Sequence, residues 1–208
     1  GTWGLMAAAA IGAIAALHDV PTVVTAEDRS YAERIVAEAG YTGATRLLPA
    51  SPDFESQIRT IVAVQDAVLK ATPKNSGVAL DRGREPKDLY ELRQGLCFDR
   101  SRAMEKILSY LGMETRHASI YSTAERSAVL ALLTPDNPSH AVTEVLTAKG
   151  WMMIESNFRW IGLDAGRRPV SLSGLQRMAD RAGPWAADSA TPINGIFLRD
   201  FVFVRGLY

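Results

Sequence analysis

The chain has 208 residues, of which 47% are hydrophobic and 22% charged, and its 23 basic and 23 acidic side chains give a formal net charge of zero. This length suits one domain, and we expect a single domain over residues 1–208. A neutral chain lacks the positive field that nucleic acid or an anionic membrane surface requires, so neither is expected as the main partner. One cysteine excludes an internal disulfide, and three histidines without zinc-ligand spacing predict neither a metal site nor a cofactor.

An uncharged, alanine-rich run extends from Trp3 to Leu17. It is shorter than the ~20 residues that cross a bilayer, and no basic segment precedes it. Two interpretations of residues 1–20 stay open: a buried N-terminal helix, or what remains of a signal or membrane anchor. The second interpretation allows membrane attachment through this segment, and we favour a periplasmic or membrane-associated location over a cytoplasmic one. The oligomeric state is not predicted.

Two scaffold helices are predicted before the cysteine. Thr25 is a typical N-cap followed by acidic residues, and Gly40 ends the helical pattern that it begins. The second helix is expected to begin at Ser51-Pro52, with proline at the first helical position, and to carry an apolar stripe as far as Leu69. A loop over residues 73–84 and a short helical turn from Pro86 then lead to Gly95.

Cys97 lies in the first turn of a helical pattern that Gly112 ends. A lone cysteine is more often a small buried residue than a catalyst. At a helix N-terminus, however, unpaired backbone N–H groups and the positive end of the helix dipole favour a thiolate. The same N–H groups can hold the oxyanion that forms when a thiolate attacks a carbonyl. Cys97 is therefore a candidate nucleophile that requires a base.

His140 is the histidine whose context fits a base. His18 lies beside the N-terminal apolar run, and His117 falls in a predicted strand over 115–121, where a structural or surface role is expected. His140 begins a predicted strand over 139–147. A second predicted strand over 151–157 follows Lys149-Gly150, so the two strands form an antiparallel hairpin.

The hairpin brings two candidate partners to His140. In a hairpin with an even-length loop, residues of opposite parity face one another, so Glu155 and Asn157 share a face with His140. A carboxylate or amide beside the imidazole fixes its tautomer and orientation, which is the third role in a catalytic triad. Glu155 is the candidate for this role, and Asn157 is the alternative.

The segment from Pro86 to Asn157 resembles the core of the transglutaminase-like superfamily. The matching residues are Gly95, Cys97, Asp99, Gly112, Arg116, His140-Ala141, Gly150-Trp151 and Glu155. The resemblance implies an α+β, papain-like fold in which a Cys-bearing helix packs on an antiparallel β-sheet, with N-terminal helices and a catalytic core over 86–157. It also implies that Cys97 is the nucleophile, His140 the base and Glu155 the orienting acid, where the family usually has Asp.

The activity implied by the resemblance is acyl transfer at amide or peptide bonds through a thioester. A protease, peptidase or amidase is favoured, because compact bacterial-looking members of the superfamily are often hydrolases. Transglutamination and a non-catalytic interaction module are the alternatives. A third is amine acylation, because the segment Arg93 to Asp99 also resembles the signature of arylamine N-acetyltransferases. A protein or peptide is the expected substrate.

Several segments are expected to serve this site or the scaffold. The Gln94 side chain is a candidate oxyanion donor, and Trp151 is a candidate wall of the acyl channel. A lid is expected within Tyr121 to Asn137. Near the C-terminus, a helix over 171–183 and a strand within 193–204 are predicted.

Overall fold

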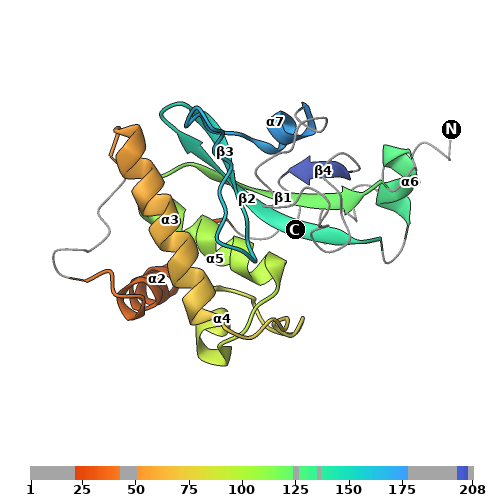
Figure 1. Ribbon diagram of the computed structural model, residues 1–208. Helices are drawn as coiled ribbons and strands as arrows, with labels where there is room; N and C mark the ends of the chain where they lie inside the picture. The colour runs from red at the N-terminus through yellow and green to blue at the C-terminus, as the bar shows by residue number, and fades with distance from the viewer. Residues whose placement is uncertain (1–21, 43–50, 124–126, 135–136, 178–200, 206–208) are drawn as a thin grey trace, which may run out of the picture.

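A four-stranded antiparallel sheet and a group of helices make up the described structure. The computed structural model describes residues 22–42, 51–123, 127–134, 137–177 and 201–205 (Figure 1). The strands follow the order β3-β2-β1-β4 and are β1 (Thr115–Ser122), β2 (Ser139–Thr147), β3 (Gly150–Ile154) and β4 (Phe201–Arg205). The helices are α2 (Ala26–Glu38), α3 (Phe54–Ala71), α4 (Pro86–Leu92), α5 (Cys97–Tyr110), α6 (Ala128–Leu133) and α7 (Leu172–Arg177). The predicted α+β fold is confirmed.

The sheet buries apolar side chains on both of its faces. On one face, Val145, Met152 and Ile154 belong to the larger core together with residues of α3 and α5. On the other face, Val142 and Met153 pack in a smaller core with residues of α7. Each fully buried aliphatic side chain contributes about 1.5–3 kcal/mol of transfer free energy, so α5 is held firmly between α3 and the sheet.

The helix that carries Cys97 begins and ends where its sequence predicts. Cys97 is the first residue of α5, after an extended N-cap residue, Leu96. Asp99 accepts a hydrogen bond from the Leu96 backbone N–H at 2.9 Å. The helix ends before Gly112, whose φ of +86° is a conformation that glycine adopts without strain. The N-terminus of α5, with Cys97 in its first turn, is therefore well defined.

Two predicted boundaries are wrong. Helix α3 begins at Phe54, not at Ser51-Pro52, because the Asp53 side chain caps it by accepting a hydrogen bond from the Ser56 N–H at 2.7 Å. Strand β3 ends at Ile154, before Glu155 and Asn157, because the chain turns back on itself. The turn is closed by the Glu155 N–H, which donates to the Trp160 carbonyl at 3.1 Å.

Some predicted segments lie wholly or partly outside the described residues. The apolar run from Trp3 to Leu17 is one of them. Of the helix predicted over 171–183, the structure describes α7, and of the strand predicted within 193–204 it describes residues that belong to β4. Helix α6 lies within the segment expected to form a lid. Across the described parts of the chain, no helix is both long enough and apolar enough to cross a membrane.

Candidate functional site

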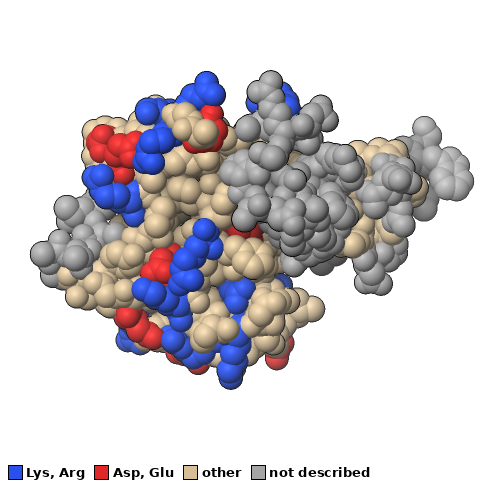
Figure 2. All heavy atoms as spheres, viewed as in Figure 1, with Lys and Arg blue, Asp and Glu red and all other residues tan. Residues whose placement is uncertain are grey.

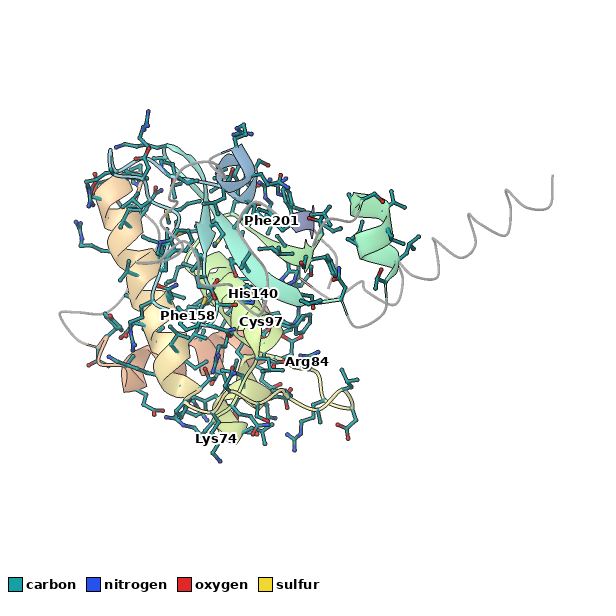
Figure 3. All side chains as sticks on the ribbon, turned by 45° about the vertical axis from the view of Figure 1, so that its right-hand side comes forward. Lys74, Arg84, Cys97, His140, Phe158 and Phe201 are labelled. Atoms are coloured by element: carbon teal, nitrogen blue, oxygen red, sulfur yellow. The ribbon has the colours of Figure 1, made fainter. Side chains whose placement is uncertain are left out.

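The side chains of Cys97, His140 and Glu155 form a continuous chain of hydrogen bonds. Cys97 at the start of α5 bonds to the imidazole of His140 at the start of β2, and the two residues lie side by side in Figure 3. The His140 Nε2 atom is 2.9 Å from each carboxylate oxygen of Glu155. Because Nε2 faces the carboxylate, Nδ1 is the ring nitrogen that serves Cys97. The sulfur and the carboxylate thus occupy opposite sides of one imidazole.

Burial and partners act in opposite directions on the ionisation of this group. His140 and Glu155 are 2% and 1% exposed. Burial disfavours the imidazolium, but the Glu155 carboxylate and the Cys97 side chain together raise the pKa of His140 to about 10. Burial also disfavours the thiolate, but His140 and the backbone N–H groups of Ala141 and Phe98 hold the pKa of Cys97 below its ordinary value. The arrangement therefore favours a thiolate–imidazolium pair.

The β2–β3 hairpin brings His140 and Glu155 together in the way that parity predicts. Thr143 pairs with Ile154 and Val145 with Met152, so paired residues have opposite parity. Glu155 is the first residue after β3, and its side chain reaches His140 near the start of β2. The Ser156 hydroxyl donates to the Ala141 carbonyl at 2.6 Å, which extends the contact between the two segments beyond the end of β3.

Asn157 contacts Glu155 through its backbone and Arg100 of helix α5 through its side chain. Its backbone N–H donates to Glu155 Oε1 at 2.8 Å, and its Oδ1 accepts from Arg100 Nη1 at 2.8 Å. The structure therefore places Glu155 against the imidazole and uses Asn157 to hold Glu155 in place.

Arg100 and Gln65 are two supporting residues that the sequence did not suggest. Arg100 is 5% exposed and donates to Asn157 as well as to the Thr72 carbonyl at 3.0 Å and the Asn75 Oδ1 at 3.1 Å. Gln65 is 3% exposed, and its Nε2 lies 2.6–2.9 Å from the carbonyl oxygens of Glu155, Phe158 and Trp160. Both residues hold the turn that follows β3 in place. The sequence pattern showed only that each is a polar residue on the apolar face of its helix, which does not indicate a role at the site.

Gln94 and Trp151 differ in how they relate to this group. Gln94 lies just before α5, and its Nε2 donates one hydrogen bond to the Gly77 carbonyl at 2.9 Å. Trp151 is the second residue of β3, four residues before Glu155, which corresponds to about 13 Å along an extended chain. The Arg116 guanidinium stacks 3.7 Å from its ring centroid, on the sheet face that α7 covers. The structure therefore does not bring Trp151 to Cys97, because Trp151 points to the face opposite α5.

Figure 2 shows basic and acidic side chains interspersed on the face in view, in keeping with the zero net charge. Among the described residues, no group of three or more His, Cys, Asp or Glu side chains is arranged to hold a metal ion. The chemistry available at the site is that of a thiolate, an imidazole and a carboxylate.

The sequence matches the model of a known protein family over more than half of its length. The sequence model of the transglutaminase-like superfamily matches residues 50–165, which include all of α3, α4, α5 and the first three strands. A search of curated protein sequences finds no match. The similarity of the Arg93 to Asp99 segment to arylamine N-acetyltransferases is not confirmed by these comparisons.

Proposed function

Because the chain belongs to the transglutaminase-like superfamily, we propose that it is a cysteine-dependent acyl-transfer enzyme that cleaves amide or peptide bonds. In this proposal Cys97 is the nucleophile, His140 the acid–base and Glu155 the residue that orients His140. One observation carries the proposal: a cysteine with a lowered pKa at a helix N-terminus is hydrogen-bonded to a buried histidine that is itself bonded to a carboxylate.

The first half-reaction forms a thioester. The Cys97 sulfur attacks the substrate carbonyl carbon, and the carbonyl electron pair moves onto its oxygen. The backbone N–H of Cys97 has no acceptor inside α5, because the first N–H groups of a helix are unpaired, so it is available to the oxyanion. The His140 imidazolium donates its Nδ1 proton to the departing amine as the carbon–nitrogen bond breaks. The products of this step are an acyl-Cys97 thioester and neutral His140.

The second half-reaction releases the acyl group. Neutral His140 takes a proton from water, the resulting hydroxide attacks the thioester carbonyl, and the sulfur leaves as the thiolate. The carboxylate of Glu155 keeps the imidazole in one tautomer and stabilises its charged form in both half-reactions. Gln94 is our candidate for a second oxyanion donor, since one of its two amide hydrogens is directed to Gly77 and the other remains.

The reactivity of the thiol tests the nucleophile. We expect iodoacetamide to alkylate Cys97 rapidly at pH 6, where an ordinary thiol of pKa ~8.5 is only about 0.3% ionised. The His140→Ala variant should lose most of this reactivity at pH 6 and recover it near pH 9, because the sulfur then titrates as an ordinary thiol. A parent protein whose reactivity follows the ordinary thiol profile would overturn the proposed triad and favour a non-catalytic interaction module.

Product analysis tests whether water or an amine accepts the acyl group from Cys97. The parent and Cys97→Ala would be incubated with an unfolded protein mixture, with and without a labelled primary amine, and the peptides analysed by mass spectrometry. Hydrolysis produces new N-termini in the parent alone, and this is the result we expect. Incorporation of the amine at glutamine side chains in place of new N-termini would instead identify transglutamination.

A further inference from the structure

Arg100 carries a buried positive charge whose hydrogen bonds all go to neutral oxygen atoms. The side chain is 5% exposed, and its guanidinium keeps its proton at any pH at which the protein folds. Its five hydrogen bonds equal in number the five N–H donors of the group. The acceptors are the hydroxyl and carbonyl oxygens of Thr72, the carbonyl oxygen of Lys74, and the side-chain oxygens of Asn75 and Asn157. A buried charge without an opposite charge nearby is strongly destabilising, so we looked for the anion that balances it.

The proposed triad has the charge that Arg100 lacks. In its thiolate–imidazolium form, Cys97 and Glu155 are negative and His140 alone is positive, which leaves one negative charge in excess. Cys97 and Arg100 are three residues apart on α5, and residues at this spacing are neighbours on one side of a helix. Asn157 links Arg100 to Glu155, since its side chain accepts from Arg100 at 2.8 Å and its N–H donates to Glu155 at 2.8 Å.

The remaining carboxylate near Arg100 has a cation of its own. Asp99 Oδ1 accepts a hydrogen bond from Arg84 Nε at 2.7 Å. Burial lowers the pKa of Arg100, and the negative charges of Cys97, Asp99 and Glu155 act against this effect, with Cys97 first among them. Because Asp99 is already paired with Arg84, the charge of Arg100 is left for the triad.

We infer that Arg100 balances the negative charge of the triad and stabilises the Cys97 thiolate through its electric field, without touching the substrate. Its N–H donors are all used by the protein, so the guanidinium has none to offer to an oxyanion or to a substrate carboxylate. The inference rests on the proposed function. The excess of one negative charge persists through that reaction, because the oxyanion replaces the thiolate while His140 is charged, and Glu155 alone is charged in the acyl-enzyme.

The test compares Arg100→Gln, which removes the charge, with Arg100→Lys, which keeps it. We expect the midpoint of iodoacetamide alkylation of Cys97 to rise by about one pH unit in Arg100→Gln and to stay within about 0.3 units of the parent in Arg100→Lys. A rise of one unit corresponds to about tenfold less thiolate at any pH well below the midpoint. A purely structural role would not separate the two variants by charge.

Iodoacetate, which is an anion, tests the field at the sulfur directly. At pH 9 the ratio of its alkylation rate to that of neutral iodoacetamide reports the local charge around the thiolate. We expect this ratio to fall about threefold in Arg100→Gln and to be unchanged in Arg100→Lys.

A second pair of variants does not depend on replacing the buried side chain. Asn75 is exposed, and its Oδ1 accepts from Arg100 Nη1 at 3.1 Å. Asn75→Asp places a carboxylate against the guanidinium, and we expect it to raise the alkylation midpoint by about half a unit. Asn75→Ala removes the same hydrogen bond, leaves the charge of Arg100 in place and should keep the midpoint of the parent.

Two results would overturn the inference. The first is a midpoint and a rate ratio that are the same in Arg100→Gln and Arg100→Lys, which would mean that Arg100 acts only by holding the turn after β3. The second is a midpoint that does not change in Asn75→Asp, and this result decides the question if thermal unfolding shows that Arg100→Gln is not folded. The proposed function is tested separately by the alkylation profile of the parent, whereas the inference depends only on differences between the variants and the parent.

Discussion

The Nε2 atom of His140 lies at 2.9 Å from both carboxylate oxygens of Glu155, so the carboxylate faces the ring nitrogen with both of its oxygens. Both side chains are almost completely buried. In a region of low dielectric, such a contact strengthens the preference of the ring for its charged form. Because Nε2 faces the carboxylate, Nδ1 is the nitrogen that bonds to the Cys97 sulfur.

Replacing Glu155 should separate the effect of its charge from the effect of its shape. Glu155→Gln removes the carboxylate that raises the pKa of His140, so the imidazolium is lost at lower pH and the pKa of Cys97 rises. We expect the midpoint of iodoacetamide alkylation to move to higher pH and kcat to fall by about 10²- to 10⁴-fold. Glu155→Asp keeps the charge and should retain most of the low-pH reactivity. An unchanged profile in Glu155→Gln would remove Glu155 from the triad.

Asn157→Ala should have a much smaller effect than Glu155→Gln. Its backbone N–H continues to hold Glu155 after the substitution, and only the bond from Arg100 to the side chain is lost. We expect the alkylation midpoint to stay within about half a pH unit of the parent value, and the free energy of unfolding to fall by about 1 kcal/mol. If the alkylation profile instead shifted as far as in Glu155→Gln, Asn157 would be the partner of the imidazole.

Trp151→Leu should leave the reactivity of Cys97 unchanged. The substitution removes the stacking of Arg116 on the indole, on the sheet face covered by α7, and this contact is worth about 0.5–1 kcal/mol at a half-exposed site. We therefore expect a small loss in urea-unfolding free energy, and equal labelling of Cys97 in the variant and the parent by a set of N-acetyl dipeptidyl vinyl methyl sulfones. A tenfold rise in the half-saturating concentration of those probes would place Trp151 in the acyl channel after all.

Glu144 should contribute to stability in a pH-dependent way. Its side chain is fully buried on the α7 side and accepts from Arg205 Nε at 2.6 Å, from Arg116 Nε at 2.8 Å and from the Leu172 N–H at 2.9 Å. Burial raises the pKa of Glu144, but Arg205, the Leu172 N–H and Arg116 outweigh it and hold the pKa below its usual range. A depressed pKa means that the carboxylate stabilises the fold above its unfolded-state pKa, near 4.3, and that this stabilisation is lost as the pH falls through the lower, folded-state pKa.

The matched pair for this prediction is Glu144→Gln and Glu114→Gln, since Glu114 is exposed. In urea unfolding at pH 7 we expect Glu144→Gln to cost about 1.5–3 kcal/mol and Glu114→Gln to cost little. The cost of Glu144→Gln should shrink as the pH is lowered below 4. A cost that is the same at pH 7 and pH 3 would show that the charge of Glu144 does not matter.

The parts of the site that the sequence predicts are those set by local rules. The helix start at Cys97 follows from the spacing of apolar residues between Gly95 and Gly112, and the meeting of His140 with the turn after β3 follows from the two-residue period of a hairpin. These rules operate within one element or between neighbours in the chain, and they need no knowledge of the tertiary arrangement.

The supporting residues could not be predicted, because each acts on a segment far away in the sequence. Gln65 lies 90 residues before Glu155, whose carbonyl it binds, and Arg100 lies 57 residues before Asn157. Nothing in the pattern of α3 or α5 says which turn will pack against these side chains. The predicted length of β3 was wrong for the same reason. The strand ends where the Glu155 N–H bonds to the Trp160 carbonyl, which belongs to the segment that returns after the turn.

The contact between Arg100 and Asn157 has a consequence for how substitutions combine. The bonds from Cys97 to His140, from His140 to Glu155, from Glu155 to Asn157 and from Asn157 to Arg100 return to α5 one turn after they leave it. They form a closed ring that includes the helix itself. When one hydrogen bond of this closed chain is broken, the side chains next to it are held less firmly. The small loss of unfolding free energy caused by Asn157→Ala should therefore disappear in a protein that already carries Glu155→Gln.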